Sequence, residues 1–415
     1  MSAPVSVVVV SRNRPTWLQR CLRALDQLDY DPFEVVVVAC AKGIAAAKNA
    51  TTLRPVTLVP FDKANISDAR NVGVRNSLGQ ILAFIDDDAV PEPTWLAHLI
   101  PVFDAPNVDQ AGGTTLGRNG ISVQHAAARV TPFGKTVAVA VPTGDPIEIC
   151  VQDECWPRLH GTNMAVRRSA LVHVGGFDPS YAFYLDETDL TCRVAKAGGA
   201  TVHVPNAVVH HTSAESAVRN HDRVPRDLHA IGYSTALFHS EHAAPTLHKA
   251  ARTEFLHERR QWLLQHVQQG TLTPDDLYIK MRALRRGYSH GMQAPKSGRQ
   301  VLDQVRVGDI KPTDKTLAKD VYLTSSTLMR GRVFEKAKTL VHQGHRVTVL
   351  DFDPSARFHK VTFVDDGYWL HTGGIWGREE RDERLFQRCL RNHRVRSALT
   401  RIKGVRSLTP MMPAN

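Results

Sequence analysis

The feature that most constrains the fold is an alternation of apolar runs and helical stretches in the first 90 residues. β-Branched runs of strand length are separated by segments whose apolar residues recur near helical spacing. The pattern predicts strands over residues 5–10, 33–39, 56–60 and 81–85 and helices over residues 17–28 and 67–77. Strand–helix–strand units build parallel strands with helices on the sheet, so we expect an α/β fold.

Three adjacent aspartates, Asp86, Asp87 and Asp88, follow the last of these strands in the stretch FIDDDAVPEPTWL. Adjacent carboxylates repel one another, and burying them unpaired is costly. A solvated acidic turn is the simpler interpretation. In open α/β sheets, however, ligands bind at the carboxyl ends of the strands. That placement favours a functional cluster that holds a divalent cation.

Composition sets broad limits on the class of protein. The 415 residues suffice for two domains, and 42% hydrophobic with 22% charged residues indicates a globular chain. The net charge of +11 fits an anionic partner such as a nucleotide, a nucleic acid or a membrane surface. The six cysteines lack paired spacing, so neither a disulfide framework nor a zinc site is predicted. The opening resembles a strand rather than a secretion signal, and we expect a cytoplasmic protein.

A second dense region, residues 159–213, begins a helix with acidic residues. Asp186 can cap this helix, and Asp189 can pair with Arg193 one turn later. These structural roles leave Glu187 unassigned. A carboxylate close to the aspartate cluster is a candidate general base.

Two histidines, His210 and His211, end a short strand predicted at residues 207–211, after another at 201–204. Alternation along a strand puts neighbouring side chains on opposite faces, so at most one of the two should point into a given site. A lone histidine is more often structural than a metal ligand.

The remaining sequence divides into further parts. The pattern weakens between residues 91 and 151, with one strand at 136–141, and turns helical after residue 214. The last hundred residues start a new strand–helix–strand unit and end in a basic helix at 379–402. We expect a first domain over 1–240, a helical extension and linker over 241–312, and a small Rossmann-like module with a basic C-terminal helix over 313–415.

Residues 1–240 resemble family-2-type nucleotide-sugar glycosyltransferases of the GT-A fold. The matching elements, in order, are VSVVVVSRNRP, the ARN-x-G segment at residues 69–73, FIDDDAVPEPTWL, GGFD at 175–178, DETDL at 186–190 and a histidine after P-x-A-x-V. Six ordered elements over half the chain are far more specific than a lone DxD. The resemblance implies a GT-A-like mixed, mainly parallel sheet with a nucleotide-binding Rossmann-like half.

The same resemblance implies roles for individual residues. Asp86 and Asp88 would hold the ribose and a Mn²⁺ or Mg²⁺ ion, and His211 would be a metal ligand while His210 faces away. Glu187 would be the catalytic base, although the inverted order of the acidic pair leaves Asp186 as a rival. Contacts to the donor are implied for Arg70, Asp86, Asp87, Gly161 and Asn163.

One departure concerns the nucleobase. The family commonly ends its second strand with VVVDNGS, whose aspartate reads the base, whereas this chain has VVVVACAKG with Ala39 at that place. Uracil recognition therefore does not carry over to this chain.

The expected function is a metal-dependent, inverting transfer of a sugar from a nucleotide-sugar donor to a hydroxyl of a glycan, lipid-linked or other acceptor. The alternatives are a catalytically silent sugar-nucleotide-binding protein and a basic nucleic-acid-binding protein, for which no RNA or DNA motif is present. A dinucleotide-dependent oxidoreductase would need GxGxxG where SRNRP stands.

The C-terminal module resembles more loosely the start of a GT-B-type glycosyltransferase domain. The matching sequence segments are GHRVTVL and DGYWLHT, and the module lacks the second nucleotide-binding half of such a domain. We expect an accessory module that contacts an acceptor, a second subunit or, through its basic helix, an anionic membrane at the inner face. On this interpretation it is dispensable for donor binding.

Overall fold

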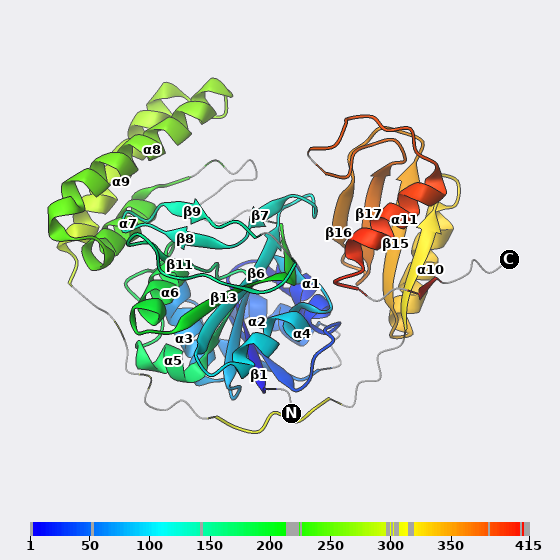
Figure 1. Cartoon of the computed structure of the whole chain (residues 1–415), viewed down its shortest axis with the longest axis horizontal. Coiled ribbons are helices and arrows are strands. Elements are labelled where there is room, and N and C mark those ends of the chain that lie inside the picture. The colour runs from blue at the N-terminus through cyan, green and yellow to red at the C-terminus, as the bar shows by residue number, and fades with distance from the viewer. Residues whose placement is uncertain are drawn as a thin grey trace.

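The computed structural model shows a large α/β domain, a helical extension and a small α/β module (Figure 1). It describes residues 3–50, 54–141, 144–212, 224, 226–295, 299, 302, 307–313, 319–380, 382–406 and 409–410. Within the predicted helical extension and linker over 241–312, residues 296–298, 300–301 and 303–306 therefore lie outside the described residues. Among the described helices, none is both long enough and apolar enough to cross a membrane.

The parallel half of the large sheet follows the sequence prediction. Its elements are β1 (Val5–Ser11), α1 (Pro15–Leu25), β2 (Phe33–Ala39), α2 (Ala41–Lys48), β3 (Val56–Pro60), α3 (Ile66–Arg75) and β4 (Ile81–Asp86). β1 pairs in parallel with β2 and β4, and β2 pairs in parallel with β3. Helix α2 is an addition that the sequence analysis did not predict.

The other half of the sheet is mixed. Its strands are β5 (Ala89–Pro91), β6 (Val108–Leu116), β7 (Val123–His125), β10 (Ile147–Glu148), β12 (Met164–Arg167) and β13 (Ala200–His211). β12 runs antiparallel between β4 and β6, and β13 runs parallel to β6. The order is β10-β13-β6-β12-β4-β1-β2-β3, with β5 on β13 and β7 on β6. The predicted GT-A-like sheet of mixed direction is therefore confirmed.

Helices cover both faces of this sheet. Apolar side chains of α1, α2 and α4 (Trp95–Leu99) form one core cluster with β1, β2 and β4. A second cluster on the opposite face joins α3, α5 (Arg168–His173) and α6 (Asp186–Lys196). The 3-10 helix η1 (Pro101–Asp104) follows α4. Burial on both faces explains why the strands of the parallel half are nearly continuous apolar runs.

The strands predicted at 201–204 and 207–211 are one strand, β13, with an irregularity of register between Val204 and Val208. Strands β6 and β12 were not predicted, because glycines interrupt the first and the second is short. A separate small sheet contains β8 (Ala128–Val130), β9 (Thr136–Ala138) and β11 (Trp156–Arg158). It packs near α6 through a cluster that includes Val130 and Cys192.

The helical extension consists of α7 (His229–His242), η2 (Pro245–Leu247), α8 (His248–Gln268) and α9 (Pro274–Gln293). α7 and α9 pack tightly because glycines face the neighbouring backbone. A Cβ on Gly287 would lie 2.0 Å from the carbonyl oxygen of His229. Helix α9 begins with a capping box between Thr273 and Asp276. In Figure 1 α8 and α9 project away from the large sheet.

The C-terminal module has a sheet in the order β16-β17-β15-β14-β18. Its elements are β14 (Asp320–Ser325), α10 (Arg330–His342), β15 (Arg346–Asp353), β16 (Lys360–Phe363), β17 (Trp369–Gly374), α11 (Arg391–Ile402) and β18 (Thr409–Pro410). The basic helix predicted from residue 379 is wrong in its start, since α11 begins at Arg391. Glu379 lies outside the helix and pairs with Arg394 and Arg401.

The C-terminal module is docked against the large domain. Val361 and Trp369 share a core cluster with Val90 of β5. The backbone N–H of Val361 donates to the carbonyl oxygen of Asn119 at 2.9 Å. The extension and the module each have a core cluster of their own, and the cluster of the extension includes Leu228 and Ala236, which precede residue 240. The expected boundary at residue 240 therefore falls inside α7, and the division of the chain at residues 240 and 312 stays a proposal.

Candidate active site

The aspartate cluster at the end of β4 is neutralised in part by the protein itself. Asp87 accepts hydrogen bonds from Ser11 Oγ at 2.7 Å and from Arg14 Nη1 at 2.9 Å. The same Arg14 nitrogen lies 3.1 Å from Asp88. Burial raises the pKa of Asp87 to about 7, although Arg14 opposes the shift. The Asp87 carboxylate thus holds Arg14 in place, and its expected contact with the donor stays a prediction.

The flanking aspartates form a cluster with a histidine. One ligand atom each from Asp86, Asp88 and His211 lies within 4.8 Å of the others. Nε2 of His211 is 3.4 Å from Asp88 Oδ1. Two carboxylates and one imidazole suit a divalent ion that completes its coordination with phosphate oxygens. These residue types and spacings fit the metal that the sequence resemblance implies.

Pairing of β5 with β13 brings Asp88 and His211 together. His211 is in register with Ala89, and the backbone N–H of Thr212 donates to the carbonyl oxygen of Asp88 at 3.1 Å. Nδ1 of His211 lies 3.2 Å from Oε1 of Gln124 on β7. That contact fixes the ring and directs Nε2 toward the aspartates, as outer-shell partners of metal-binding histidines do.

His210 points away from this cluster, as alternation along the strand predicts. Its Nε2 lies 2.7 Å from Oε1 of Glu92, and its ring is tilted by 55° against the ring of Trp369 of the C-terminal module, at 4.8 Å between ring centres. His210 therefore belongs to the contact between the two α/β units.

Arg70 joins the two acidic motifs. Its Nη1 lies 2.5 Å from Asp186 Oδ2, and its Nη2 lies 3.3 Å from Asp86 Oδ1. Burial alone would lower the pKa of this guanidinium. The nearby charges of Asp186 and Asp86 outweigh burial, so the pKa is raised above its ordinary value. A Cβ on Gly161 would lie 2.2 Å from Arg70 Nη2, so only glycine permits this position of the guanidinium. Gly161 thus supports Arg70 by close approach.

The start of α6 differs from the sequence prediction. The N-cap is Leu185, at φ 64°, and not Asp186, which lies in the first turn. Asp186 is buried and bound to Arg70, and burial raises the pKa of its carboxyl while Arg70 opposes this. Tyr184 also has a positive φ of 73°. Two consecutive residues in this sparsely populated region turn the chain sharply into the helix.

Glu187 is half-buried at the second position of α6. It is near enough to Arg70 and Asp186 to influence the pKa of both. Arg70 therefore lies between two parts of the candidate site. On one side is Asp86 of the candidate metal cluster, and on the other is the acidic helix start with Glu187.

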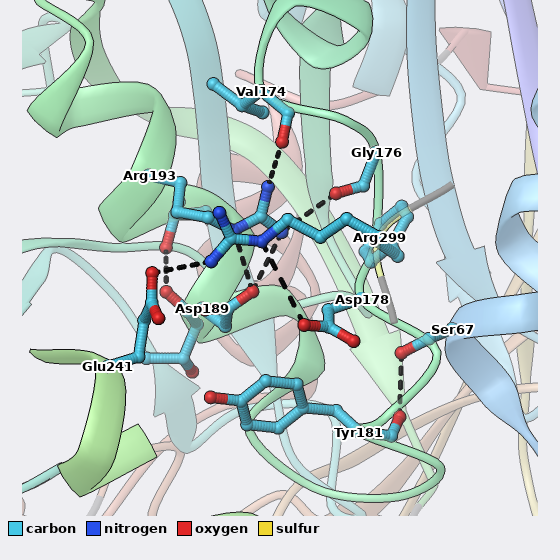
Figure 2. A network of polar contacts seen from close by, with 12 residues as sticks. Ser67, Val174, Gly176, Asp178, Tyr181, Asp189, Arg193, Glu241 and Arg299 are labelled. Carbon is cyan, nitrogen blue, oxygen red and sulfur yellow. Dashed lines mark hydrogen bonds and ion pairs between the residues drawn. The ribbon is translucent and has the colours of Figure 1, made fainter. Parts of the chain in front are cut away.

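A polar network behind α6 holds the helix in place (Figure 2). Arg193 pairs with Asp189 at 2.8 Å, as the sequence predicts, and donates to the carbonyl oxygens of Val174 and Gly176. His242 of α7 lies 2.9 Å from the other oxygen of Asp189. Burial raises the pKa of Asp189, but Arg193 and His242 lower it more, to about 2.

Asn163 has its side chain occupied by the protein. Its Nδ2 donates to the carbonyl oxygens of Thr114 and Ala207, and its Oδ1 accepts from Trp95 Nε1 at 2.8 Å. The buried amide ties β6, β13 and α4 together. These contacts give the side chain a role in positioning the strands, and its expected contact with the donor stays a prediction.

Several side chains of the site were missed by the sequence analysis. Arg14, Thr162 and Gln124 contact the aspartates or His211, with Thr162 Oγ1 donating to Asp86 Oδ2 at 2.6 Å. Arg14 lies in the quoted SRNRP segment, and Thr162 lies between Gly161 and Asn163. The positions of Arg14 and Thr162 within these segments could have indicated a role in the site, whereas no local sequence pattern indicates Gln124.

The nucleobase end of the site is apolar at Ala39. A Cβ on Gly43 would lie 2.7 Å from the Ala39 Cβ, so α2 approaches the end of β2 closely. Ala39 offers no polar group to a base, in keeping with the departure noted in the sequence.

Comparison with known proteins gives matches to glycosyltransferases. Residues 6–175 match the model of Glycosyl transferase family 2. The N-acetylglucosaminyl-diphospho-decaprenol L-rhamnosyltransferase of Mycobacterium tuberculosis is 47% identical over 62 residues, which are 15% of this chain and 20% of that protein. Glycosyltransferase AglE of Haloferax volcanii is 31% identical over 116 residues, 26% of this chain and 38% of that protein.

Among solved structures, the mannosyltransferase PcManGT from Pyrobaculum calidifontis, in complex with GDP-Man and Mn²⁺, matches with a TM-score of 0.42 and 17% identity. The match covers 70% of this chain and 88% of that chain. The chain spans less than two fifths of the length of the two curated relatives. Residues 6–175 of the N-terminal α/β domain thus carry the similarity to glycosyl transferase family 2.

Proposed function

We propose that the chain is a metal-dependent inverting glycosyltransferase that moves a sugar from a nucleotide-sugar donor to an acceptor hydroxyl. One observation carries the proposal: Arg70 bridges Asp86 of the metal-binding cluster and Asp186 beside Glu187. Groups that can hold a diphosphate and a group that can accept a proton therefore lie on either side of one buried cation. A glycosyl transfer needs both groups.

The metal-binding side would hold the leaving diphosphate. Asp86, Asp88 and His211 are the ligands that this chain would supply to Mn²⁺ or Mg²⁺. A bound ion would neutralise the charge that develops on the diphosphate. Gln124 fixes the His211 ring, and Arg14 holds Asp88 through an ion pair.

The acidic side would activate the acceptor. Asp186 is committed to Arg70, whereas Glu187 is half-buried at the same helix start. We therefore assign the general base to Glu187. Its carboxylate would take the acceptor proton while the hydroxyl attacks the anomeric carbon. Attack on the face opposite the leaving diphosphate inverts that carbon.

The acceptor is proposed to be lipid-linked or presented at a membrane. The relative from Mycobacterium tuberculosis is named for a decaprenol-linked acceptor. In the C-terminal module, Leu328, Phe386 and Leu390 are 97%, 54% and 81% exposed. A cavity of about 380 Å³ is lined by Trp376, Phe386, Arg388, Cys389 and Leu390, so Phe386 and Leu390 border it.

The apolar and basic residues that line this cavity replace helix α11 as the proposed contact with an anionic membrane. Arg394 and Arg401 of α11 pair with Glu379, so they contribute less positive charge than the sequence suggests. Amphipathic surfaces with exposed apolar side chains and arginines bind at the inner, anionic face of membranes. We propose peripheral binding there from the cytoplasm.

The second candidate function is a silent sugar-nucleotide-binding protein. Ala39 favours it, because the residue that reads the base in related sequences is absent. Donor hydrolysis separates the two functions, since a silent protein binds the donor without cleaving it.

The test is a panel of nucleotide sugars assayed for Mn²⁺-dependent hydrolysis and transfer. We expect at least one donor to be cleaved with Mn²⁺ and not with excess EDTA. Asp88→Asn should abolish the Mn²⁺ dependence, and Asp104→Asn, an exposed aspartate outside the cluster, should not. Binding without cleavage for every donor would favour the silent protein, and cleavage of equal rate in EDTA would contradict the metal role.

A further inference from the structure

The C-terminal module reaches the back of the metal site. β5 and β13 form a short ribbon whose one end carries Asp88 and His211. The backbone N–H of Glu92 continues the ribbon by donating to the carbonyl oxygen of Val208 at 3.0 Å. Because cross-strand partners share a face, Val90 and His210 lie together on the face opposite Ala89 and His211. That opposite face meets the C-terminal module.

Arg406, which follows α11, binds the ribbon. Its Nε and Nη2 each lie 2.6 Å from one carboxylate oxygen of Glu92. His210 Nε2 lies 2.7 Å from the same carboxylate. Glu92 therefore links His210, which precedes His211 on β13, to Arg406, which is 314 positions from Glu92 in the sequence.

The module also fixes Arg406 from its own side. The guanidinium carbon lies 3.8 Å from the centre of the Trp369 ring, which is itself 4.8 Å from the ring of His210. Nη1 lies 3.3 Å from both Thr348 Oγ1 and His371 Nε2. A planar guanidinium held by a bidentate carboxylate and an aromatic face has little freedom to move.

All of these groups are buried. Glu92, Arg406 and Trp369 are each at most 3% exposed. Burial alone would raise the pKa of Glu92, but Arg406 and His210 bring it down to about 2. Without Arg406, the buried carboxylate of Glu92 would be paired only with His210. Burying a poorly paired charge is costly enough to displace the ribbon from its position.

We propose that Arg406, with Glu92 and Trp369, positions the β5–β13 ribbon so that Asp88 and His211 face one metal ion. The inference rests on the proposed metal-dependent function. It makes the C-terminal module a supporting part of the donor site, in contrast to the sequence expectation that the module is dispensable for donor binding. Arg406 touches neither metal nor donor, so it is a positioning residue.

The matched control is Arg346, another buried arginine at the same interface. Its hydrogen bonds and ion pairs among the described residues run to Gln27, Asp29 and Asp320, and not to the ribbon. Arg346→Ala should weaken docking of the module without moving Asp88 or His211.

The experiment measures binding of Mn²⁺ alone to the full chain by electron paramagnetic resonance. We expect Arg406→Ala to weaken Mn²⁺ binding at least tenfold and Arg346→Ala to change it less than twofold. Adding Glu92→Gln to Arg406→Ala removes the stranded charge and should restore most of the affinity. Equal Mn²⁺ affinity in wild type and Arg406→Ala, or equal loss in both arginine variants, would overturn the proposal.

Hydrogen exchange provides a readout independent of the metal. In Arg406→Ala, amides of residues 89–92 and 208–212 should exchange at least tenfold faster than in Arg346→Ala. If Arg406→Ala does not fold, Arg406→Lys, which loses the bidentate contact, should show the same local change. Failure of wild type to bind Mn²⁺ would refute the metal function, while unchanged exchange in the ribbon would refute the positioning role.

Discussion

The two Rossmann-like sheets of this chain have very different carboxyl edges. We call the ends of β1 and β4 with the start of α6 the first edge, and the ends of β14, β15 and β17 the second edge. At the first edge, Arg70 lies beneath the acidic residues and leaves Asp86 and Glu187 partly accessible. At the second edge, Arg391 donates to the carbonyl oxygens of Ser325 and Phe352, so α11 sits over the strand ends.

The difference shows that a strand–helix–strand pattern does not by itself make a ligand site. The second edge also has a buried aspartate, Asp351, but Arg330 binds it at 2.8 Å. The first edge gains its chemistry from segments distant in sequence, since β13 supplies His211 and α6 supplies Glu187. Convergence of such segments distinguishes the two edges.

The largest expected effect is on stability at the first edge. Arg70→Met would leave Asp186 buried without its partner, and we expect the free energy of unfolding to fall by about 3–5 kcal/mol. At the second edge, Arg357→Met removes an exposed partner of Asp353 and should cost less than about 1 kcal/mol. Urea unfolding of the two variants measures both values. Equal losses would show that the first edge does not depend on its buried cation.

The next effect is on catalysis. Glu187→Gln keeps the shape of the side chain but cannot accept a proton, so transfer should fall by roughly a hundredfold or more. Mn²⁺ and donor affinity should stay nearly unchanged. Asp186→Asn should mainly lower stability, because it weakens the ion pair with Arg70. If Asp186→Asn abolished transfer while Glu187→Gln retained it, the base would be Asp186.

The parallel half of the sheet could be predicted because its signals are local. Apolar runs gave β1 to β4, and the aspartate motif with the later histidine gave the metal cluster. β6 was missed because Gly112 and Gly113 interrupt its apolar pattern. These glycines are needed for packing, since a Cβ on Gly113 would lie 1.9 Å from the carbonyl oxygen of Ala207.

The supporting residues could not be predicted from local patterns. Gln124, Glu92 and Arg406 act through pairings that exist only once distant strands meet. Asp186 was taken for a helix cap because its role depends on Arg70, which is 116 positions earlier. Local chemistry therefore identifies the reactive groups better than the groups that hold them.

A smaller effect is expected at low pH behind α6. The pKa of Asp189 is about 2 in the folded protein, below its ordinary 3.8. A lowered pKa stabilises the fold above the unfolded-state pKa, and that stability is lost as pH falls from about 4 to about 2. The contribution at neutral pH is about 2 kcal/mol. Asp189→Asn should remove this part of the pH dependence of urea unfolding; an unchanged slope would contradict it.

The smallest expected effects on stability come from alanine substitutions of one glycine near each edge. Gly161→Ala would press on Arg70, and we expect a loss of about 1–3 kcal/mol together with slower transfer. Gly331→Ala in α10 meets nothing within 4 Å and should stabilise the protein by about 0.5–1 kcal/mol. Thermal unfolding of both variants provides the comparison. A stabilising Gly161→Ala would show that Arg70 has room to move.

The contact between Glu92 and Arg406 has a consequence for synthesis of the protein. The two residues are 314 positions apart, so the ribosome must translate most of the chain after Glu92 before its partner exists. At about 5–20 residues per second, that interval lasts on the order of 15–60 seconds. During this time the nascent first domain would carry a buried carboxylate without its arginine. Acquisition of metal would then wait until Arg406 has been translated, and a stop codon shortly before Arg406 would release a chain with an intact first domain that is unable to complete its site.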